Sequence, residues 1–226
     1  MKTNHLVEII RNIQGKFKKN ELAYLALTGK IELPLRDKIA FSIQKEFLKD
    51  FIVAREWTHK ENHARFDIAI FDKYIRDENI EYNFPDYLIE FKARAVPGFQ
   101  NSYSTKVIKD FKKLLDSGDN DTIRYFVLFN TIITGKLRKS LNPAIDKYLR
   151  QIFSFSEKKK INNYEQIRYE IEKNWNNYLK SNNLEKNRTQ IIEIEAGKFF
   201  GLSVYILTMI YGPIKKDTGQ TKKTSK

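Results

Sequence analysis

The sequence predicts an α/β fold. Segments whose apolar residues recur with helical spacing alternate with short runs of aromatic and β-branched residues, which favour strands. A chain of 226 residues can form one domain with a sizeable core, or one domain with a small appendage. No internal repeat is visible, so residues 1–214 are expected to form a single domain.

Three helices and then three strands are expected in the first half of the chain. Short helices are predicted at residues 4–14 and 20–29, and Pro34 opens a longer one. The longer helix has an apolar stripe, which consists of Leu35, Ile39, Ile43 and Phe47. Three strands follow, each rich in aromatic and β-branched side chains, at residues 50–57, 65–71 and 87–93.

The second half of the chain is expected to continue the alternation of helices and strands. Residues 101–115 have helical spacing, and a strongly apolar strand is predicted at residues 122–133. Residues 190–211 are expected to form one or two strands, with a break near Gly197. Two further helices are predicted between these strands, at residues 137–153 and 163–180.

Charged side chains interrupt two of the apolar strands. Asp67 lies in the second predicted strand, and Glu90 and Lys92 lie in the third. Because side chains alternate along a strand, Glu90 and Lys92 point to the same face. Burial of a carboxylate or an ammonium is unfavourable unless the two pair or the carboxylate holds a metal. A carboxylate pair and a lysine on neighbouring strands would suit a metal-dependent phosphodiesterase.

The order Asp67, then Glu90-x-Lys92, resembles the motif of the PD-(D/E)XK nuclease superfamily, which has the restriction-endonuclease-like fold. The resemblance covers residues 34–132, where helix, three strands, helix and strand follow in the order of that family's α/β/α core. Arg65-Phe66 stands where the family often has a proline before its first acid. The resemblance implies a mixed central sheet with N-terminal and C-terminal helical additions.

The resemblance also implies a magnesium site, in which Mn²⁺ can substitute. Mg²⁺ prefers oxygen ligands, usually one or two carboxylates together with waters and phosphate oxygens. Asp67 and Glu90 would supply the carboxylates, and Phe91 would supply its carbonyl oxygen. Lys92 would orient the attacking water or stabilise negative charge that develops on the phosphate. The alternative is an ordinary ion pair, Glu90–Lys92 or Asp67–Lys92, in a partly exposed strand.

Glu46 is a further candidate ligand, because it lies on the helix before the first strand. Many members of the family carry an acid on this helix that completes the metal site. Glu46 falls close to the face that Ile39 and Ile43 bury. The alternative is a solvated glutamate, since lysines flank it. Arg36 and Asp37 are secondary candidates on the same helix.

The charge of the chain favours a polyanionic partner. Lys and Arg number 41 against 28 Asp and Glu, which gives a net charge of +13. A tail at residues 215–226 holds five of the lysines and is expected to be disordered. A lysine-rich genome would explain the same excess without any nucleic acid. The residues expected to contact DNA lie on or before the helix that follows the motif: Gln100, Lys106, Lys109 and Lys112.

By this resemblance the protein is expected to be a Mg²⁺-dependent DNA endonuclease, used in type II restriction or another anti-phage defence. A homodimer is expected, because two sites related by a two-fold axis match two antiparallel strands. The chain has no cysteine, no visible signal peptide, and no apolar run as long as the roughly 20 residues that cross a bilayer. We therefore expect a cytoplasmic protein without a membrane partner. The alternative function is a non-catalytic nucleic-acid-binding protein or assembly subunit.

Overall fold

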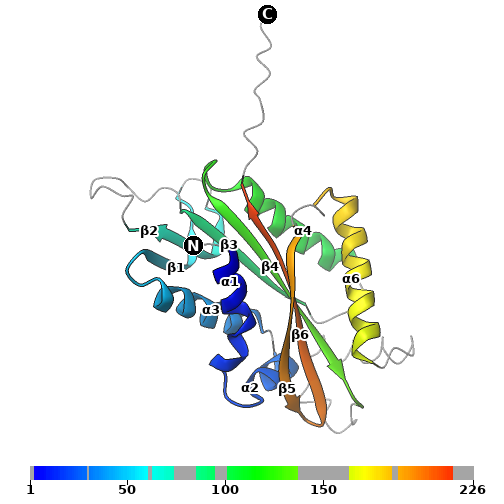
Figure 1. The fold of residues 1–226 in the computed structure, drawn as a ribbon. Helices are drawn as coiled ribbons and strands as arrows, with labels where there is room; N and C mark the ends of the chain where they lie inside the picture. Colours follow the sequence, from blue (N-terminus) through cyan, green and yellow to red (C-terminus); the bar gives the residue numbers. More distant parts are fainter. Residues whose placement is uncertain are drawn as a thin grey trace, which may run out of the picture.

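Seven stretches of the chain are described by the computed structural model: residues 3–29, 31–60, 63–73, 85–94, 101–136, 163–184 and 188–215. Within them, five α-helices and one short 3-10 helix pack against a six-stranded mixed sheet (Figure 1). The predicted helix at residues 137–153, Gln100, and the tail from residue 216 onward lie outside the described residues.

The sheet has the strand order β1-β2-β3-β4-β6-β5. Neighbouring strands run antiparallel, except that β3 and β4 are parallel. A parallel pair needs a crossover connection, and α4 lies between β3 and β4 in the chain. The strands are β1 (Phe51–Thr58), β2 (Arg65–Asp72), β3 (Tyr87–Arg94), β4 (Ile123–Thr134), β5 (Arg188–Phe199) and β6 (Leu202–Ile214).

Helices cover both faces of the sheet. One hydrophobic core joins the first three α-helices to one face, and a second core joins the last two to the other face (Figure 1). The predicted α/β class is therefore confirmed, with a mixed sheet between two helical layers. The helices are α1 (Thr3–Arg11), η1 (Ile13–Lys16), α2 (Glu21–Thr28), α3 (Glu32–Glu46), α4 (Asn101–Asp116) and α6 (Tyr164–Ser181).

The apolar stripe of α4 fixes this helix against β4. Val107, Ile108, Phe111 and Leu114 are all buried, and their spacing puts them on one side of the helix. Phe111 stacks on Phe126 of β4, with ring centroids 4.7 Å apart. Loss of one such buried ring typically costs about 3–5 kcal/mol. The packing therefore sets which of the α4 lysines turn toward β3 and which face outward.

The alternation of side chains in β1 and β2 changes phase at Glu56 and Asp67, the two positions that lie between the Arg55–Ile68 and Trp57–Phe66 pairs of the register. Ile68 packs in the core on the α3 side, and Ala69 packs in the core on the α4 side. Strict alternation would put Phe66 on the same side as Ile68, but Phe66 packs on the α4 side. Glu56 has a φ of 51°, a left-handed conformation that residues other than glycine rarely adopt. This distortion lies at the site described below.

Several boundaries differ from the prediction, and two of them concern α3 and the last strand segment. Helix α3 begins at Glu32, so Pro34 lies within its first turn. The break in the last predicted strand segment is at Phe200–Gly201, where φ is 55° and 78°, and the flanking Phe199 and Leu202 pair. Two positive φ values in a two-residue loop form a tight hairpin turn. Gly197 instead lies at a register shift inside β5.

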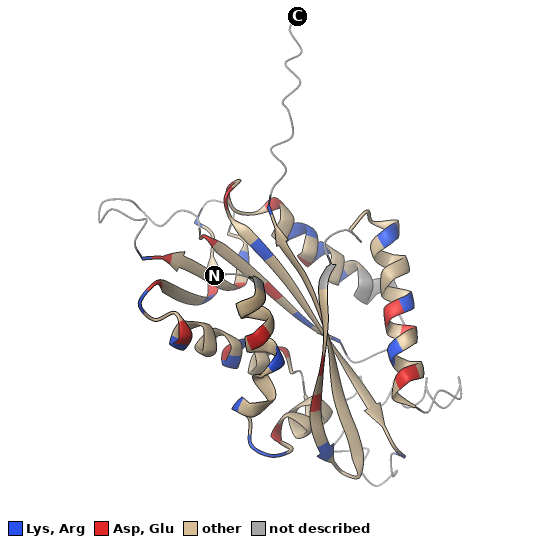
Figure 2. Cartoon of the chain, viewed as in Figure 1, with Lys and Arg blue, Asp and Glu red and all other residues tan. Residues whose placement is uncertain are grey.

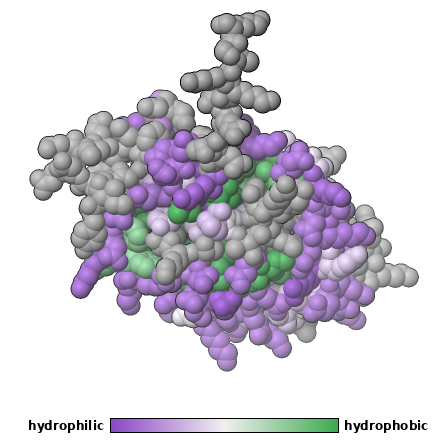
Figure 3. All heavy atoms as spheres, turned by 45° about the horizontal axis from the view of Figure 1, so that its top comes forward, coloured by the Kyte–Doolittle hydropathy of each residue, from purple (hydrophilic) through white to green (hydrophobic). Residues whose placement is uncertain are grey.

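Hydrophilic residues make up most of the described surface in Figure 3, with hydrophobic residues visible toward its centre. No described helix is both long enough and apolar enough to span a lipid bilayer. Most of the large apolar side chains of the described residues lie in the two cores on either side of the sheet.

Candidate functional site

The candidate site lies where β2 and β3 separate. Pairing between these strands reaches Ile68 and Ile89 and goes no further in this direction. Beyond it, the amide of Phe91 donates to Asp67 Oδ2 at 2.8 Å, and the amide of Asp67 donates to Glu90 Oε2 at 3.4 Å. Buried backbone amides need an acceptor. The two carboxylates therefore replace the strand-to-strand hydrogen bonds that end here.

A third carboxylate completes this edge of β3. The amide of Ala93 donates to Glu32 Oε2 at 2.9 Å, across 61 residues of sequence. Alternate residues of a strand direct their amides to the same edge, so Phe91 and Ala93 both point toward the side that β2 has left. Asp67 and Glu32 accept one amide each. The first turn of α3 is thereby attached to the end of β3.

Glu90 is the most deeply buried acid of the group, with a residue exposure of 4%. Its Oε1 lies 3.0 Å from Lys113 Nζ and 3.7 Å from Lys92 Nζ. Burial, followed by the charge of Asp67, raises the pKa of Glu90 to about 7, although Lys113 and Lys92 act in the opposite direction. A carboxylate whose pKa is raised to neutrality in this way is typical of functional sites.

Lys92 lies among three carboxylates. Its Nζ is 3.3 Å from Asp110 Oδ2, 3.7 Å from Glu90 Oε1 and 3.8 Å from Glu32 Oε1. Burial alone would lower the pKa of Lys92, but the charges of Glu32, Glu90 and Asp110 outweigh it, so this pKa lies above its ordinary value. Lys92 is therefore an ammonium at neutral pH. The Glu90–Lys92 ion pair, which the sequence left open as the alternative to a metal site, is part of a larger network.

Lys113 is a residue of the site that the sequence did not single out. Its Nζ donates to the carbonyl of Arg65 at 2.7 Å and to Glu90 Oε1 at 3.0 Å. The same ammonium lies 4.7 Å from the centroid of the Phe66 ring, a cation–π geometry. Lys113 thus connects α4 to β2 and β3 at once. The only sequence signal was its place beside Leu114 in the apolar stripe, and this does not distinguish it from Lys112.

Arg36 borders Asp67 from the α3 side. Its Nη1 lies 2.7 Å from Glu56 Oε1 and 3.6 Å from Asp67 Oδ1, while its Nη2 lies 2.9 Å from Asp37 Oδ1. Arg55 pairs with the other oxygen of Asp37 at 3.1 Å. Burial opposes the charge of Arg36, but hydrogen bonds to Glu56 and Asp37 outweigh it and raise the pKa of the guanidinium. Figure 2 shows both acidic and basic residues on α3, β3 and α4.

The structure does not bring Glu46 into this group. Glu46 is the exposed last residue of α3, and the neighbouring Gln44 bonds to Phe51 and Val53 at the start of β1. Glu32, at the other end of the same helix, is the acid that reaches β3. Glu46 follows Glu32 by 14 positions, roughly 21 Å along the helix axis, so only one of these two acids can contact the carboxylates.

The lysines expected to contact DNA are exposed on α4. Asp110, on the same helix, faces Lys92. The helix that carries these lysines therefore also contacts the site through Asp110. These lysines are Lys106, Lys109 and Lys112.

The donor set of the site is compatible with one Mg²⁺ ion held by few protein ligands. No group of three or more acidic, histidine or cysteine side chains arranged to hold a metal occurs among the described residues. Asp67 and Glu90 lie on neighbouring strands, and the Phe91 carbonyl points to the same edge as its amide. Two carboxylates with a carbonyl match the preference of Mg²⁺, which retains several waters.

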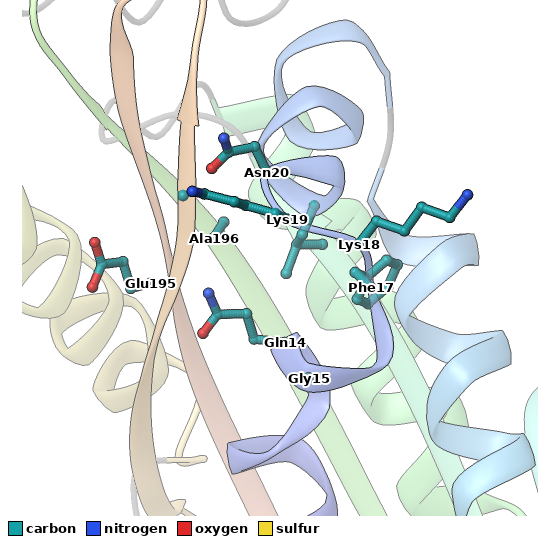
Figure 4. A pocket seen from close by; sticks show the side chains of 10 residues that line it. Gln14, Gly15, Phe17, Lys18, Lys19, Asn20, Glu195 and Ala196 are labelled. Atoms are coloured by element: carbon teal, nitrogen blue, oxygen red, sulfur yellow. The ribbon is translucent and has the colours of Figure 1, made fainter.

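A hollow of about 470 Å³ lies elsewhere on the surface, between the end of η1, the start of α2 and β5 (Figure 4). In this view Lys19 extends across it toward Ala196, whereas Lys18 points away. Glu195 is the one acid of its lining. The hollow therefore has no pair of carboxylates comparable to Asp67 and Glu90. Its lining consists of Gln14, Gly15, Phe17, Lys18, Lys19, Asn20, Leu22, Glu195, Ala196 and Gly197.

The chain matches no known protein-family model, and comparison with curated proteins and with solved structures finds no significant similarity to either.

Proposed function

We propose that the protein is a Mg²⁺-dependent DNA endonuclease with a restriction-endonuclease-like core, acting in restriction or another anti-phage defence. The proposal rests mainly on one observation: Asp67 and Glu90 meet where β2 and β3 separate, with Lys92 beside Glu90. The order α3, β1, β2, β3, α4, β4 adds support, since it follows the order of the core that the motif resembles.

Each residue of the site would have a separate role in phosphodiester hydrolysis. Asp67, Glu90 and the Phe91 carbonyl would hold Mg²⁺, which when bound polarises the phosphate and lowers the pKa of its water. Lys92 would act as a cation and not as a base, because neighbouring carboxylates raise its pKa and keep it protonated. It would donate a hydrogen bond to the attacking water or to a phosphate oxygen. Lys113 would hold Glu90 toward the same point.

A basic surface would bring the substrate to this group. The net charge is +13, and Lys106, Lys109 and Lys112 are exposed on α4. Cutting both strands of a duplex would require two copies of the chain related by a two-fold axis, so a homodimer is part of the proposal.

The test is cleavage of supercoiled plasmid with Mg²⁺ and with EDTA, by the wild type and by Asp67→Asn and Glu90→Gln. Asp67→Asn keeps an oxygen that can accept from the Phe91 amide, so it should fold. Each variant should lose more than about 100-fold in rate, since residues that merely support metal ligands already contribute 10–100-fold. The exposed Asp50→Asn is the matched control and should cleave normally.

Binding of the same DNA in EDTA tests the alternative function. A nuclease should bind without metal and cleave only when Mg²⁺ or Mn²⁺ is added. A wild-type protein that binds DNA but does not cut it with either metal would be a non-catalytic nucleic-acid-binding protein or assembly subunit. Cleavage by both Asp67→Asn and Glu90→Gln at the wild-type rate would refute the assigned site.

A further inference from the structure

A second hollow, of about 380 Å³, opens beside the carboxylates and is lined by Arg36, Arg55 and Glu56. The side chain of Arg36 is only 8% exposed, whereas those of Arg55 and Glu56 are 56% and 47% exposed. Arg36 therefore forms the inner wall, and the other two residues form the rim. Arg36 Nη1 is 3.6 Å from Asp67 Oδ1, so this hollow adjoins the proposed metal ligands.

Glu56 forms an ion pair with the guanidinium of Arg36 on its solvent side. Its Oε1 accepts from Arg36 Nη1 at 2.7 Å. The backbone of Glu56 is left-handed at this point, with a φ of 51°, a conformation that costs about 1 kcal/mol or more for residues other than glycine. The hydrogen bond to Arg36 also lowers the pKa of the Glu56 carboxyl. Glu56 is thus an ionised carboxylate held by one main contact at the mouth of the hollow.

Arg36 has other acids to balance its charge. Asp37 Oδ1 accepts from Nε and forms an ion pair with Nη2, and Asp67 lies behind Nη1. Three carboxylates, those of Asp37, Glu56 and Asp67, therefore meet two guanidiniums, those of Arg36 and Arg55. Of the three, Glu56 has the most exposed side chain. It is therefore the carboxylate that water reaches most easily and the one that can move away from Arg36 without leaving a buried site of its own.

We infer that Arg36 and Arg55 form a subsite for a phosphate group of the nucleic acid, which Glu56 fills in the free protein. This inference rests on the proposed function, because it places the subsite next to the ligands of the proposed metal site. Arginine donors match phosphate oxygens as well as carboxylate oxygens, so one anion can replace the other. Glu56 would swing outward when the phosphate enters and would disfavour binding while it stays.

Metal-free binding of a short DNA duplex, measured by fluorescence anisotropy in EDTA over a range of salt concentrations, tests the subsite. Glu56→Gln should bind about 3- to 10-fold more tightly than the wild type, because one negative charge is removed within a few ångströms of the phosphate. Glu165→Gln makes the same change at an exposed position of α6 and should alter affinity by less than about 2-fold.

Two further measurements identify the source of the effect. Arg55→Gln should weaken binding and reduce the salt slope by about one unit, while exposed Arg11→Gln on α1 should do so less. Inorganic phosphate, titrated alone and followed by the Arg36 Nε–H resonance in NMR, should bind Glu56→Gln at lower concentration than the wild type. A response to DNA but not to inorganic phosphate would mean that the subsite requires the nucleic-acid strand.

The two proposals fail separately, since these measurements need no metal and no cleavage. Equal DNA affinity for Glu56→Gln and Glu165→Gln, with an unmoved Arg36 resonance, would overturn the subsite even in an active nuclease. Tighter binding by Glu56→Gln in a protein that never cleaves DNA would support the phosphate subsite and refute the proposed nuclease activity. If Glu56→Gln does not fold, the salt slopes of Arg55→Gln and Arg11→Gln are compared instead, and equal slopes would overturn the subsite.

Discussion

Replacement of Glu90 by glutamine should change the stability of the protein in a pH-dependent way. Glu90 is 4% exposed, and burial followed by the charge of Asp67 raises its pKa to about 7. The reference pKa of the carboxyl, which serves for the unfolded chain, is 4.5. Between these two values the folded protein binds a proton that the unfolded chain has lost, so the free energy of unfolding falls as pH rises.

The size of the effect follows from the shift. Each pKa unit corresponds to about 1.4 kcal/mol, so a rise from 4.5 to about 7 corresponds to about 3 kcal/mol. This stabilisation is fully present below pH 4.5 and is lost as pH passes through 7. Glutamine does not titrate. The stability of Glu90→Gln relative to the wild type should therefore improve by about 3 kcal/mol between pH 4.5 and pH 8.

Urea unfolding in EDTA at half-unit pH steps measures this difference. Glutamine differs from the protonated carboxyl in how it accepts from Lys113, and this difference adds an offset that does not vary with the ionisation of Glu90. The slope and not the absolute value is therefore the test. Exposed Glu165→Gln is the control and should parallel the wild type. Parallel curves for Glu90→Gln and the wild type would refute the reasoning. Added Mg²⁺ at pH 8 should stabilise the wild type and not Glu90→Gln, since a ligand stabilises only the state that binds it.

Two further outcomes are expected. Lys92→Met should lose cleavage with little change in DNA affinity, because its role is confined to the transition state, whereas Lys112→Ala should weaken binding and lower the salt slope by about one unit at most. Equal losses of affinity in the two variants would make Lys92 only another phosphate contact. Truncation after Ile214 should leave the melting temperature and the cleavage positions unchanged, and should reduce activity mainly at high salt, because the removed segment is lysine-rich and contains no apolar residue. A truncated protein that unfolds or cuts elsewhere would assign the tail to the fold or to recognition.

Most helices and strands of the fold could be predicted from local sequence patterns. The stripe of Val107, Ile108, Phe111 and Leu114 predicted α4, and the apolar run at residues 122–133 predicted β4. Asp67, Glu90 and Lys92 were singled out because a charge inside an apolar strand needs a partner, and the structure gives each of them one. Such patterns report which side of an element is buried, and this information is local.

The change in strand alternation and the long-range partners of the site residues could not be predicted from such local patterns. The distortion at Glu56 and Asp67 reverses the alternation that strand patterns assume, so the sequence could not show that Asp67 turns toward Arg36. The choice between Glu32 and Glu46 depended on which end of α3 approaches β3. Helical spacing gives the angle of a residue around the axis and contains no information about this.

The chain's own pattern of apolar and charged residues determined that Asp67, Glu90 and Lys92 would need partners inside a sheet. Which partners they have depended on the packing of α3 and α4 against the two faces. Lys113 meets Glu90 from 23 residues away and Glu32 meets Ala93 from 61 residues away. Contacts over such separations follow from the strand order and the crossover through α4. Closing these long loops costs conformational entropy, and the core that α3 and α4 form with the sheet offsets this cost.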